Sequence, residues 1–288
     1  MNKIFLTGGT GMLGTYVTST LNDYGYEAIV ADRSRFDLAN HKAIYDYVKE
    51  ARPDVILHFA AETDVDLCER EPARAGICNH LATEQIAKAA QACGAWLLYI
   101  SSSNVFGAEG KISYNELDIP QPTNYYGRSK LNGEDAVRAN CPDNHLILRA
   151  GWMIGGGPGK DHKFVGKIIQ QIKDGATELK AVSDRLGSLT SAGQLSDFII
   201  KAMANRQTGT YHFASHGTIS RFDIARAIGE ILKFKGSIMP VESSRFPLSA
   251  PRPFSEGIQS IYLPSLSESC IPGYWKDDLA RYVASFQG

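Results

Sequence analysis

Three side chains of this sequence could together reduce a carbonyl group. Tyr126 and Lys130 are four residues apart, so on a helix they share one face, one turn apart. A tyrosine with a free pKa of about 10 donates a proton at neutral pH, and a nearby ammonium stabilises the phenolate left behind. Ser102 follows the apolar run 96–100, where its hydroxyl could hold the carbonyl. We predict these three as catalytic, although a Tyr/Lys pair at this spacing is also common on exposed helices.

A glycine-rich loop near the N-terminus predicts the source of the hydride. Gly8, Gly11 and Gly14 follow a short apolar run and open a segment with helical spacing. Such a strand–loop–helix unit needs glycine where φ is positive or where backbone touches a pyrophosphate, and the helix N-terminus then binds that anion. Because the loop lies between a strand and a helix, it predicts a dinucleotide site.

The choice between NADH and NADPH is left open by three charged residues. Asp32 ends the second apolar run 18 residues after Gly14, which favours NAD through the ribose hydroxyls. Arg33 and Arg35 follow directly, and an arginine there can bind a 2′-phosphate. Since the opposed contacts are of similar size, we expect either cofactor to be used, within about tenfold of the other.

Alternating strands and helices must position these groups. Apolar runs predict buried strands, and apolar residues at i, i+3 and i+4 predict helices. This order indicates an α/β fold, a doubly wound parallel sheet of Rossmann type with right-handed crossovers. The predicted strands are 3–6, 27–31, 54–61, 96–100 and 146–149, and the predicted helices are 14–21, a stripe around 44–48, 82–93 and 126–139.

The composition and periodicity of the sequence change after residue 150, which predicts a smaller C-terminal substrate domain. Segment 151–159 holds five glycines, and segment 240–272 holds six prolines with no clear helical period. Segments of this kind suit loops that build a pocket on a rigid scaffold. We expect residues 1–150 plus about 192–225 to bind the dinucleotide, and about 151–191 plus 226–288 to bind substrate.

Composition excludes several classes of protein. The 288 residues carry 30 basic and 31 acidic side chains, a net charge of −1, which argues against a nucleic-acid partner. No apolar run approaches the roughly 20 residues of a membrane helix, so we expect no membrane partner. Scattered cysteines without a CxxC pair, and histidines without HxxxH spacing, indicate no metal site and a cytoplasmic protein. We expect His58, inside a predicted strand, to be a core residue.

Five segments resemble the extended short-chain dehydrogenase/reductases, and within them the dTDP-4-dehydrorhamnose reductases. The most specific is 122–134, which matches "PxNxYGxSKLxGE", and 60–69 matches "AAxTxVDxxE". Segments 149–152, 184–190 and 252–255 are similar to "RTSW", "DQxGxPT" and "RPxxS". The resemblance implies that NADPH or NADH reduces the C4 keto group of a nucleotide-linked 6-deoxyhexose, most simply in dTDP-rhamnose and polysaccharide biosynthesis, and leaves a homodimer open.

The resemblance also implies roles for individual residues. Tyr126 would be the acid, and Lys130 would bind the nicotinamide ribose. Substrate would meet Ser102, Ser103, Trp152 and Arg252. Cofactor would meet Gly8, Gly11, Met12, Leu13, Gly14, Asp37, Leu38, Ala60, Ala61, Thr63 and Ser101, besides Asp32 and Arg33.

Departures from the family pattern leave the sugar open. The family's "STDYVF" is segment 101–106 here, with Ser103 and Asn104 in place of the aspartate and tyrosine, and its "NF" is Lys163-Phe164. A sugar with another C4 configuration remains a candidate. So do a nucleotide-sugar epimerase and a non-catalytic subunit similar to the regulatory subunit of methionine adenosyltransferase. A dehydratase is disfavoured, because it places an Asp-Glu pair where Ser103 and Asn104 stand.

Overall fold

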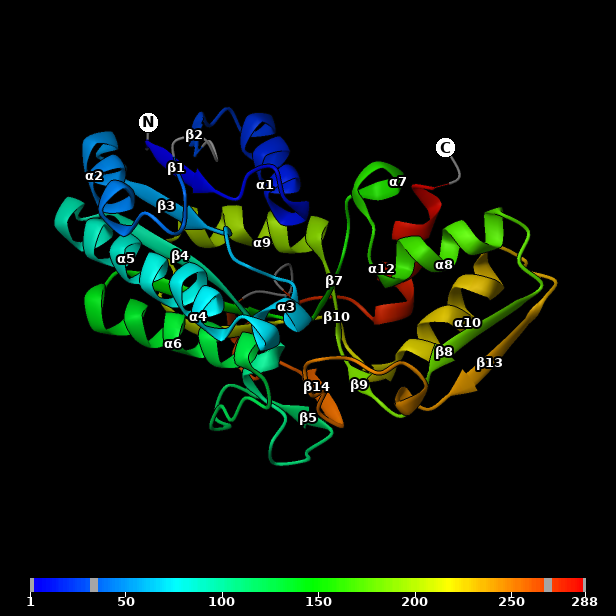
Figure 1. The fold of residues 1–288 in the computed structure, drawn as a ribbon. Helices are drawn as coiled ribbons and strands as arrows, with labels where there is room; N and C mark the ends of the chain where they lie inside the picture. The colour runs from blue at the N-terminus through cyan, green and yellow to red at the C-terminus, as the bar shows by residue number, and fades with distance from the viewer. Residues whose placement is uncertain (1–2, 32–35, 267–270, 287–288) are drawn as a thin grey trace.

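A six-stranded parallel sheet organises the first lobe of the molecule (Figure 1). This computed structural model describes residues 3–31, 36–266 and 271–286. The strand order is β11-β6-β4-β3-β1-β2, so the order reverses between the neighbouring strands β1 and β3. The strands are β1 (Ile4–Thr7), β2 (Ala28–Val30), β3 (Val55–His58), β4 (Trp96–Ser102), β6 (His145–Ala150) and β11 (Gly209–Phe213).

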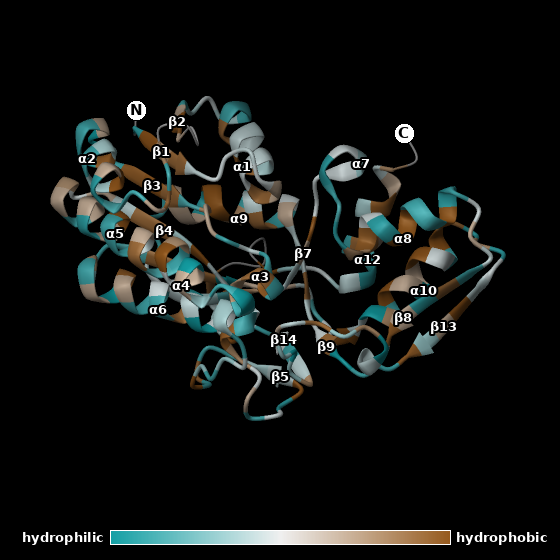
Figure 2. Cartoon of the chain, viewed as in Figure 1, coloured by the Kyte–Doolittle hydropathy of each residue, from teal (hydrophilic) through white to brown (hydrophobic). Residues whose placement is uncertain are grey.

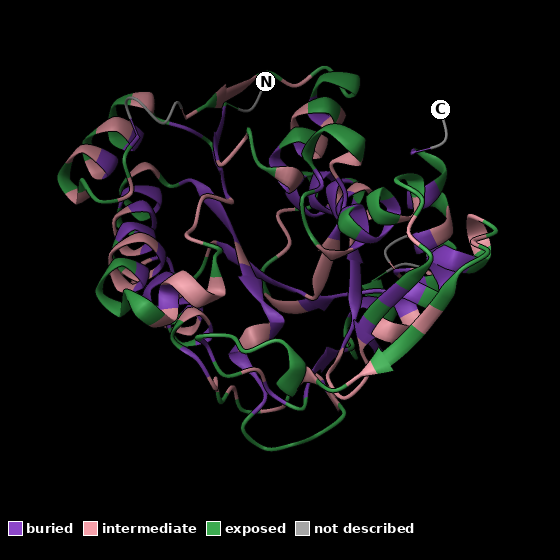
Figure 3. Cartoon of the chain, turned by 45° about the vertical axis from the view of Figure 1, so that its right-hand side comes forward, coloured by how far each residue is buried: buried purple, intermediate pink, exposed green. Residues whose placement is uncertain are grey.

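Helices cover both faces of this sheet because its strands are apolar on both sides. In β1, Ile4 and Leu6 pack with α1 (Met12–Asp23) and α9 (Ala192–Ala204), whereas Phe5 packs on the other face. That other face is covered by α2 (His41–Ala51), α5 (Ala82–Cys93) and α6 (Tyr125–Asn140). The central strands β1, β3, β4 and β6 are largely brown in Figure 2 and purple in Figure 3, as expected for a doubly covered sheet.

A second lobe has a core of its own. Three amphipathic helices pack together beside a two-stranded parallel sheet (Figure 1). The helices are α8 (Phe164–Lys173), α10 (Arg221–Ile231) and α12 (Trp275–Ala284), and the strands are β8 (Glu178–Val182) and β13 (Ser237–Val241). Helix α10 begins at a capping box in which Ser220 and Asp223 exchange hydrogen bonds.

Short strands and turns connect the lobes. β7 (Trp152–Ile154) pairs with β10 (Leu189–Ser191), and a four-stranded sheet has the order β12-β9-β14-β5. Its strands are β12 (Ile219–Ser220), β9 (Leu186–Gly187), β14 (Ser255–Ile258) and β5 (Ser113–Tyr114). The remaining elements are α3 (Val65–Arg70), α4 (Pro72–Ala75), the π-helix η1 (Gly76–Leu81), the 3-10 helices η2 (Ser103–Val105) and η3 (Ser243–Arg245), α7 (Gly157–Lys160) and α11 (Leu263–Leu266).

The structure confirms the predicted fold class and its five strands, with boundaries moved by a few residues. It corrects two details of organisation. The chain does return to the sheet, through α9 and β11, but α10 packs in the second lobe against α8 and α12, so the return ends before residue 225. Segment 240–272 is not loop alone, because β14, α11 and the end of β13 lie in it.

Candidate active site

The glycine loop packs tightly against the end of β3. Gly8 has a φ of +72°, and a Cβ there would lie 2.7 Å from the backbone nitrogen of Ala60. A Cβ on Gly14 would lie 2.2 Å from the carbonyl oxygen of Gly8. Both positions exclude any side chain, because real Cβ atoms do not approach backbone so closely. The predicted spacing therefore corresponds to two real steric requirements.

Helix α1 presents an uncapped N-terminus to this loop. Its N-cap residue is Gly11, which makes no side-chain capping bond, and its first turn carries no acid. The first N–H groups of a helix and its dipole favour an anion, and Met12 and Leu13 open this helix. The loop and helix end thus fit the pyrophosphate of a dinucleotide.

The end of β3 is tied to β1 through a buried histidine. The side chain of His58 lies between Thr7, whose Oγ1 is 2.7 Å from Nδ1, and Thr83, whose Oγ1 is 3.0 Å from Nε2. Thr7 Oγ1 also accepts from the backbone N–H groups of Phe59 and Ala60, both at 3.2 Å. Burial, followed by the charge of Lys130, lowers the pKa of His58 to about 3, which confirms a neutral core residue.

The other predicted cofactor residues lie along this same edge of the sheet. Ala60 and Ala61 are partly buried, and Thr63 is exposed in the loop before α3. Asp37 is exposed and Leu38 is partly buried after β2. Asp32, Arg33 and Arg35 lie outside the described residues.

Tyr126 lies in the first turn of α6, against the end of β4. Asn124 caps this helix by accepting from the backbone N–H of Gly127 at 2.8 Å. A Cβ on Gly127 would lie 2.0 Å from the carbonyl oxygen of Asn104, so glycine allows the helix to contact the loop after β4. Burial raises the pKa of Tyr126 to about 12, and a hydrogen bond with Ser102 opposes part of that rise. At neutral pH the phenol is therefore a proton donor.

Lys130 follows one turn later and is 3% exposed. Its Nζ lies 4.1 Å from the centre of the Tyr99 ring. Burial lowers the pKa of Lys130 to about 7, and the charge of Glu134 opposes this shift. The structure thus brings Tyr126, Lys130 and Ser102 to one place at the carboxyl edge of the sheet.

A buried ion pair lies beneath these groups. Glu134 receives two hydrogen bonds from Arg149, from Nε at 2.9 Å and from Nη2 at 2.7 Å. Ser101 Oγ donates to the same carboxylate at 2.6 Å. Burial opposes ionisation of Glu134, but Arg149 holds its pKa below the usual range. The hydroxyl of Ser101, predicted to meet cofactor, is therefore engaged in this network.

Asn79 in η1 joins the two halves of the site, and sequence reasoning missed it. Its Nδ2 donates to Ser129 Oγ and to the carbonyl oxygen of Glu62, both at 2.9 Å, while its Oδ1 accepts from the N–H of Glu62 at 2.8 Å. Ser129 in turn donates to the carbonyl oxygen of Tyr126 at 2.8 Å. One side chain thus holds the loop after β3 at a set distance from α6.

Two of the predicted substrate residues, Ser103 and Trp152, contact Glu256, which was also missed. Ser103 Oγ donates to its Oε2 at 2.9 Å, and Trp152 Nε1 donates to its Oε1 at 2.8 Å. The guanidinium of Arg221 lies 4.5 Å from the Trp152 ring centre. The Arg252 guanidinium instead donates from Nη2 to Asp66 at 2.9 Å. The only available sequence signal for Glu256 was its place directly after the "RPxxS" segment.

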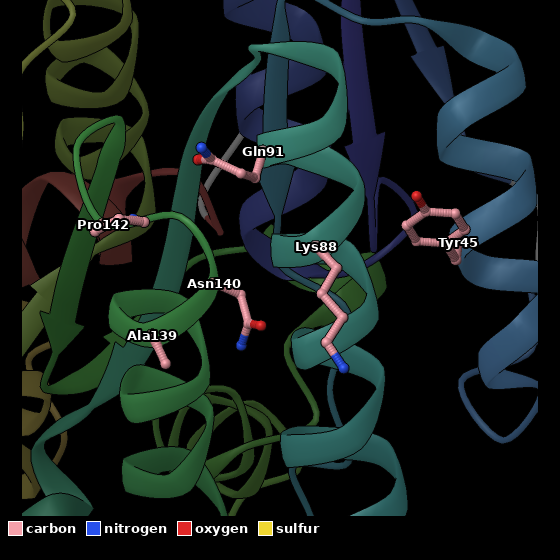
Figure 4. Close-up of a pocket in the computed structure, with 6 residues that line it drawn as sticks. All are labelled: Tyr45, Lys88, Gln91, Ala139, Asn140 and Pro142. Atoms are coloured by element: carbon pink, nitrogen blue, oxygen red, sulfur yellow. The ribbon is translucent and has the colours of Figure 1, made fainter.

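A separate surface hollow lies elsewhere, between the far ends of three helices (Figure 4). Tyr45 from α2, Lys88 and Gln91 from α5, and Ala139 from the end of α6 line it. Ala139 is about 20 Å along α6 from Tyr126, at 1.5 Å per residue. The hollow therefore lies apart from the glycine loop and Tyr126.

Within the described ranges, no helix is long and apolar enough to cross a membrane.

Comparison with known proteins places the chain in a family. The family model described as "RmlD substrate binding domain" matches residues 1–287. The dTDP-4-dehydrorhamnose reductase of Salmonella typhimurium is 34% identical over 87% of each chain. The crystal structure of the Yersinia enterocolitica dTDP-4-dehydrorhamnose reductase is 71% identical, with a TM-score of 0.98, and the match covers 99% of this chain and 100% of that one.

A third relative was solved with a dinucleotide. The dTDP-4-dehydrorhamnose reductase of Bacillus anthracis in complex with NADP is 31% identical, with a TM-score of 0.90 and coverage of 98% and 99%. The match covers nearly all of both chains, so the fold described above is shared along its length. By the family model and by these relatives, the chain belongs to the dTDP-4-dehydrorhamnose reductase family.

Proposed function

We propose that this protein reduces the C4 keto group of dTDP-4-dehydrorhamnose, with NADPH or NADH as the reductant, to form dTDP-rhamnose. The observation that carries the proposal is the convergence of Tyr126, Lys130 and Ser102 at the sheet edge, beside a loop that excludes side chains at Gly8 and Gly14. Open α/β sheets bind ligands at this edge. The relatives named above act, by their names, in the same chemistry.

The residues of the first lobe would hold the cofactor. Gly8, Gly11 and Gly14 leave room for a pyrophosphate at the N-terminus of α1, and Ala60 and Ala61 would line the adjacent wall. When bound, a reduced nicotinamide supplies the hydride, which no side chain can donate. The NADP in the Bacillus anthracis relative supports a phosphorylated cofactor.

The side chains of α6 and β4 then complete the reaction. Ser102 would hold the C4 carbonyl oxygen by donating a hydrogen bond. Tyr126 would deliver the phenolic proton to that oxygen as it gains negative charge, since its pKa of about 12 keeps it protonated beforehand. Lys130 would stabilise the resulting phenolate and hydrogen-bond the ribose. Ser103, directly after β4, and Trp152, in β7, would contact the sugar.

Absorbance of the reduced nicotinamide tests the proposal directly. The protein is mixed with dTDP-4-dehydro-6-deoxy-L-mannose and with each reduced cofactor in turn, and the product is identified by mass and by NMR. Substrate-dependent consumption, with dTDP-rhamnose as product, is expected. Tight retention of oxidised cofactor without net consumption would instead indicate an epimerase, and co-purification with a synthetase without turnover would indicate a regulatory subunit.

The proposal extends to where and in what form the enzyme acts. A nucleotide-sugar reductase that uses cellular NADPH belongs in the cytoplasm. A homodimer is compatible with this role, and light scattering at working concentration would show twice the mass of the 31.5 kDa chain.

A further inference from the structure

Glu256 brings a buried carboxylate from β14 to the end of β4. The residue is 7% exposed, and each of its carboxylate oxygens accepts a hydrogen bond from another segment. Oε2 accepts from Ser103 Oγ at 2.9 Å and from Asn104 Nδ2, and Oε1 accepts from Trp152 Nε1 at 2.8 Å. Three segments that are widely separated in sequence, 103–104, Trp152 and Glu256 itself, therefore meet at this carboxylate.

This acid lies beside the groups proposed to react. The charge of Glu256 is among the causes that raise the pKa of Tyr126, after burial. Ser103 follows Ser102, which hydrogen-bonds Tyr126. The backbone of Asn104 contacts the first turn of α6 at Gly127. Through Ser103 and Asn104, Glu256 is thus joined to the turn that follows Ser102 and contacts the first turn of α6.

The carboxylate is incompletely used by the protein. A carboxylate offers about four acceptor positions, and among the described residues three donors occupy them, two on Oε2 and one on Oε1. The guanidinium groups of Arg221 and Arg252 favour the charged form. Burial raises the pKa of Glu256, while the hydrogen bonds and these two charges oppose the rise. Among the described residues, Oε1 therefore accepts one hydrogen bond and has a second acceptor position without a donor.

The neighbouring sequence explains why an acid is needed from elsewhere. In the "STDYVF" segment that this chain resembles, an aspartate and a tyrosine stand where Ser103 and Asn104 are found. Here the two short neutral side chains donate to Glu256 instead. The end of β4 therefore regains an acid, supplied by a residue about 150 positions later in the chain.

We infer that Glu256 determines recognition of the sugar, by accepting a hydrogen bond from a ring hydroxyl adjacent to the 4-keto carbon. The inference rests on the proposed function and deepens it. A charge-assisted hydrogen bond contributes more than a neutral one, so its loss should weaken sugar binding by about tenfold or more. The dinucleotide site at Gly8–Gly14 does not involve this carboxylate and should be unaffected.

Glu256→Gln is the primary variant, because it keeps the size of the side chain and removes its charge. We expect the KM for dTDP-4-dehydro-6-deoxy-L-mannose to rise about tenfold or more, with NADPH affinity and melting temperature unchanged. Glu116→Gln is the matched control. Glu116 also accepts from three donors, Ser260 Oγ and the backbone N–H groups of His212 and Ile261, but lies away from Tyr126. Its KM should remain that of the wild type.

A double variant tests whether a carboxylate at position 103 can replace that of Glu256. Ser103→Asp in the Glu256→Gln background returns a carboxylate to the end of β4, and we expect it to lower the raised KM part of the way back to the wild-type value. Wild-type turnover with an unchanged KM in Glu256→Gln would overturn the inference alone, as would equal losses of NADPH affinity and thermal stability. If Ser103→Asp does not lower the raised KM, the claim that Glu256 takes the place of an acid at position 103 would be overturned. A wild-type protein without turnover would refute the proposed function, and this inference with it.

Discussion

At the scale of single residues, Tyr126 is the group on which the proposed chemistry depends most. Tyr126→Phe keeps the ring and its packing but removes the proton. We expect kcat to fall by about 100-fold or more, the usual size of general-acid effects, with NADPH affinity unchanged. Steady-state kinetics and a fluorescence titration of NADPH measure the two quantities. Unchanged turnover would place the proton donor elsewhere and favour the non-catalytic subunit.

Lys130 should affect both cofactor binding and turnover. Because burial lowers its pKa to about 7, the unliganded side chain loses its charge as the pH rises through neutrality. We therefore expect NADPH affinity of the wild type to decline above about pH 7, and Lys130→Met to bind weakly with a flatter pH profile. The titratable groups near Lys130 remain in the variant; they are Glu134, Cys68, His58, Tyr99 and, one turn earlier on α6, Tyr126.

Lys88→Met provides the control for this pH series. Lys88 is exposed on α5, pairs with Glu84 at 2.6 Å, and lines the hollow away from the site. Its NADPH affinity should follow the wild-type pH profile. A Lys130→Met variant with the same pH-dependent limb as the wild type would assign the titration to another group.

At the scale of elements, the turn between β1 and α1 has no room for a methyl group at Gly14. The nearest atoms to a Cβ there are backbone, at 2.2 Å and 2.6 Å, which cannot yield as a flexible side chain would. We expect Gly14→Ala to weaken NADPH binding by more than about tenfold by displacing the loop. Gly159→Ala, where no atom lies within 4 Å, should bind as the wild type does. Isothermal titration of both variants tests this, and equal affinities would show that the loop adapts.

The link between β1, β3 and α5 should make the protein sensitive to acid. His58 is buried and neutral, with a pKa of about 3 against about 6.5 in an unfolded chain. The unfolded state therefore binds more protons below pH 6.5, and stability is lost as the pH falls from there toward 3. We expect the melting temperature to drop between pH 7 and pH 5, and to drop less in His58→Gln.

The pH dependence of the free energy of unfolding sets an upper limit on the contribution of His58. One proton accounts for at most about 1.4 kcal/mol per pH unit, and His212, whose pKa burial lowers to about 4, adds a second contribution that His58→Gln retains. Thermal unfolding at both pH values in wild type and variant is the measurement. An identical drop in the two proteins would remove His58 as a cause.

At the scale of the whole molecule, the site divides into a part that was predictable and a part that was not. Tyr126 and Lys130 could be predicted because their relation is local, one helical turn, and Gly8–Gly14 because strand, loop and helix are consecutive. Glu256 could not, because its contact with Ser103 joins two segments by tertiary packing that no periodicity encodes. Asn79 could not be predicted for another reason. It lies in a helical run, and only the folded chain shows the hydrogen bonds that its side chain makes.

The fold of the two lobes was likewise predictable in part from the sequence. Buried strands such as 96–100 were predicted because hydrophobic runs indicate them directly. The pairing of β5 with β14 joins residues 113–114 to 257–258, and only the folded chain reveals it. Helix α10 follows β11 closely in sequence, yet its apolar face packs on α8 and α12. An amphipathic face predicts that a helix packs, but not which lobe receives it.

The central claim is that a hydride passes from the nicotinamide to C4 of the nucleotide-linked sugar. Transfer of deuterium tests it most directly: the protein is incubated with dTDP-4-dehydro-6-deoxy-L-mannose and NADPH carrying deuterium at the nicotinamide C4, each face labelled in turn, and the product is analysed by NMR. One deuterium is expected at C4 of dTDP-rhamnose from one of the two labelled faces, with labelled product reduced about 100-fold or more in Tyr126→Phe over the same interval. Product without deuterium from either face, or unchanged substrate with the wild type, would contradict it.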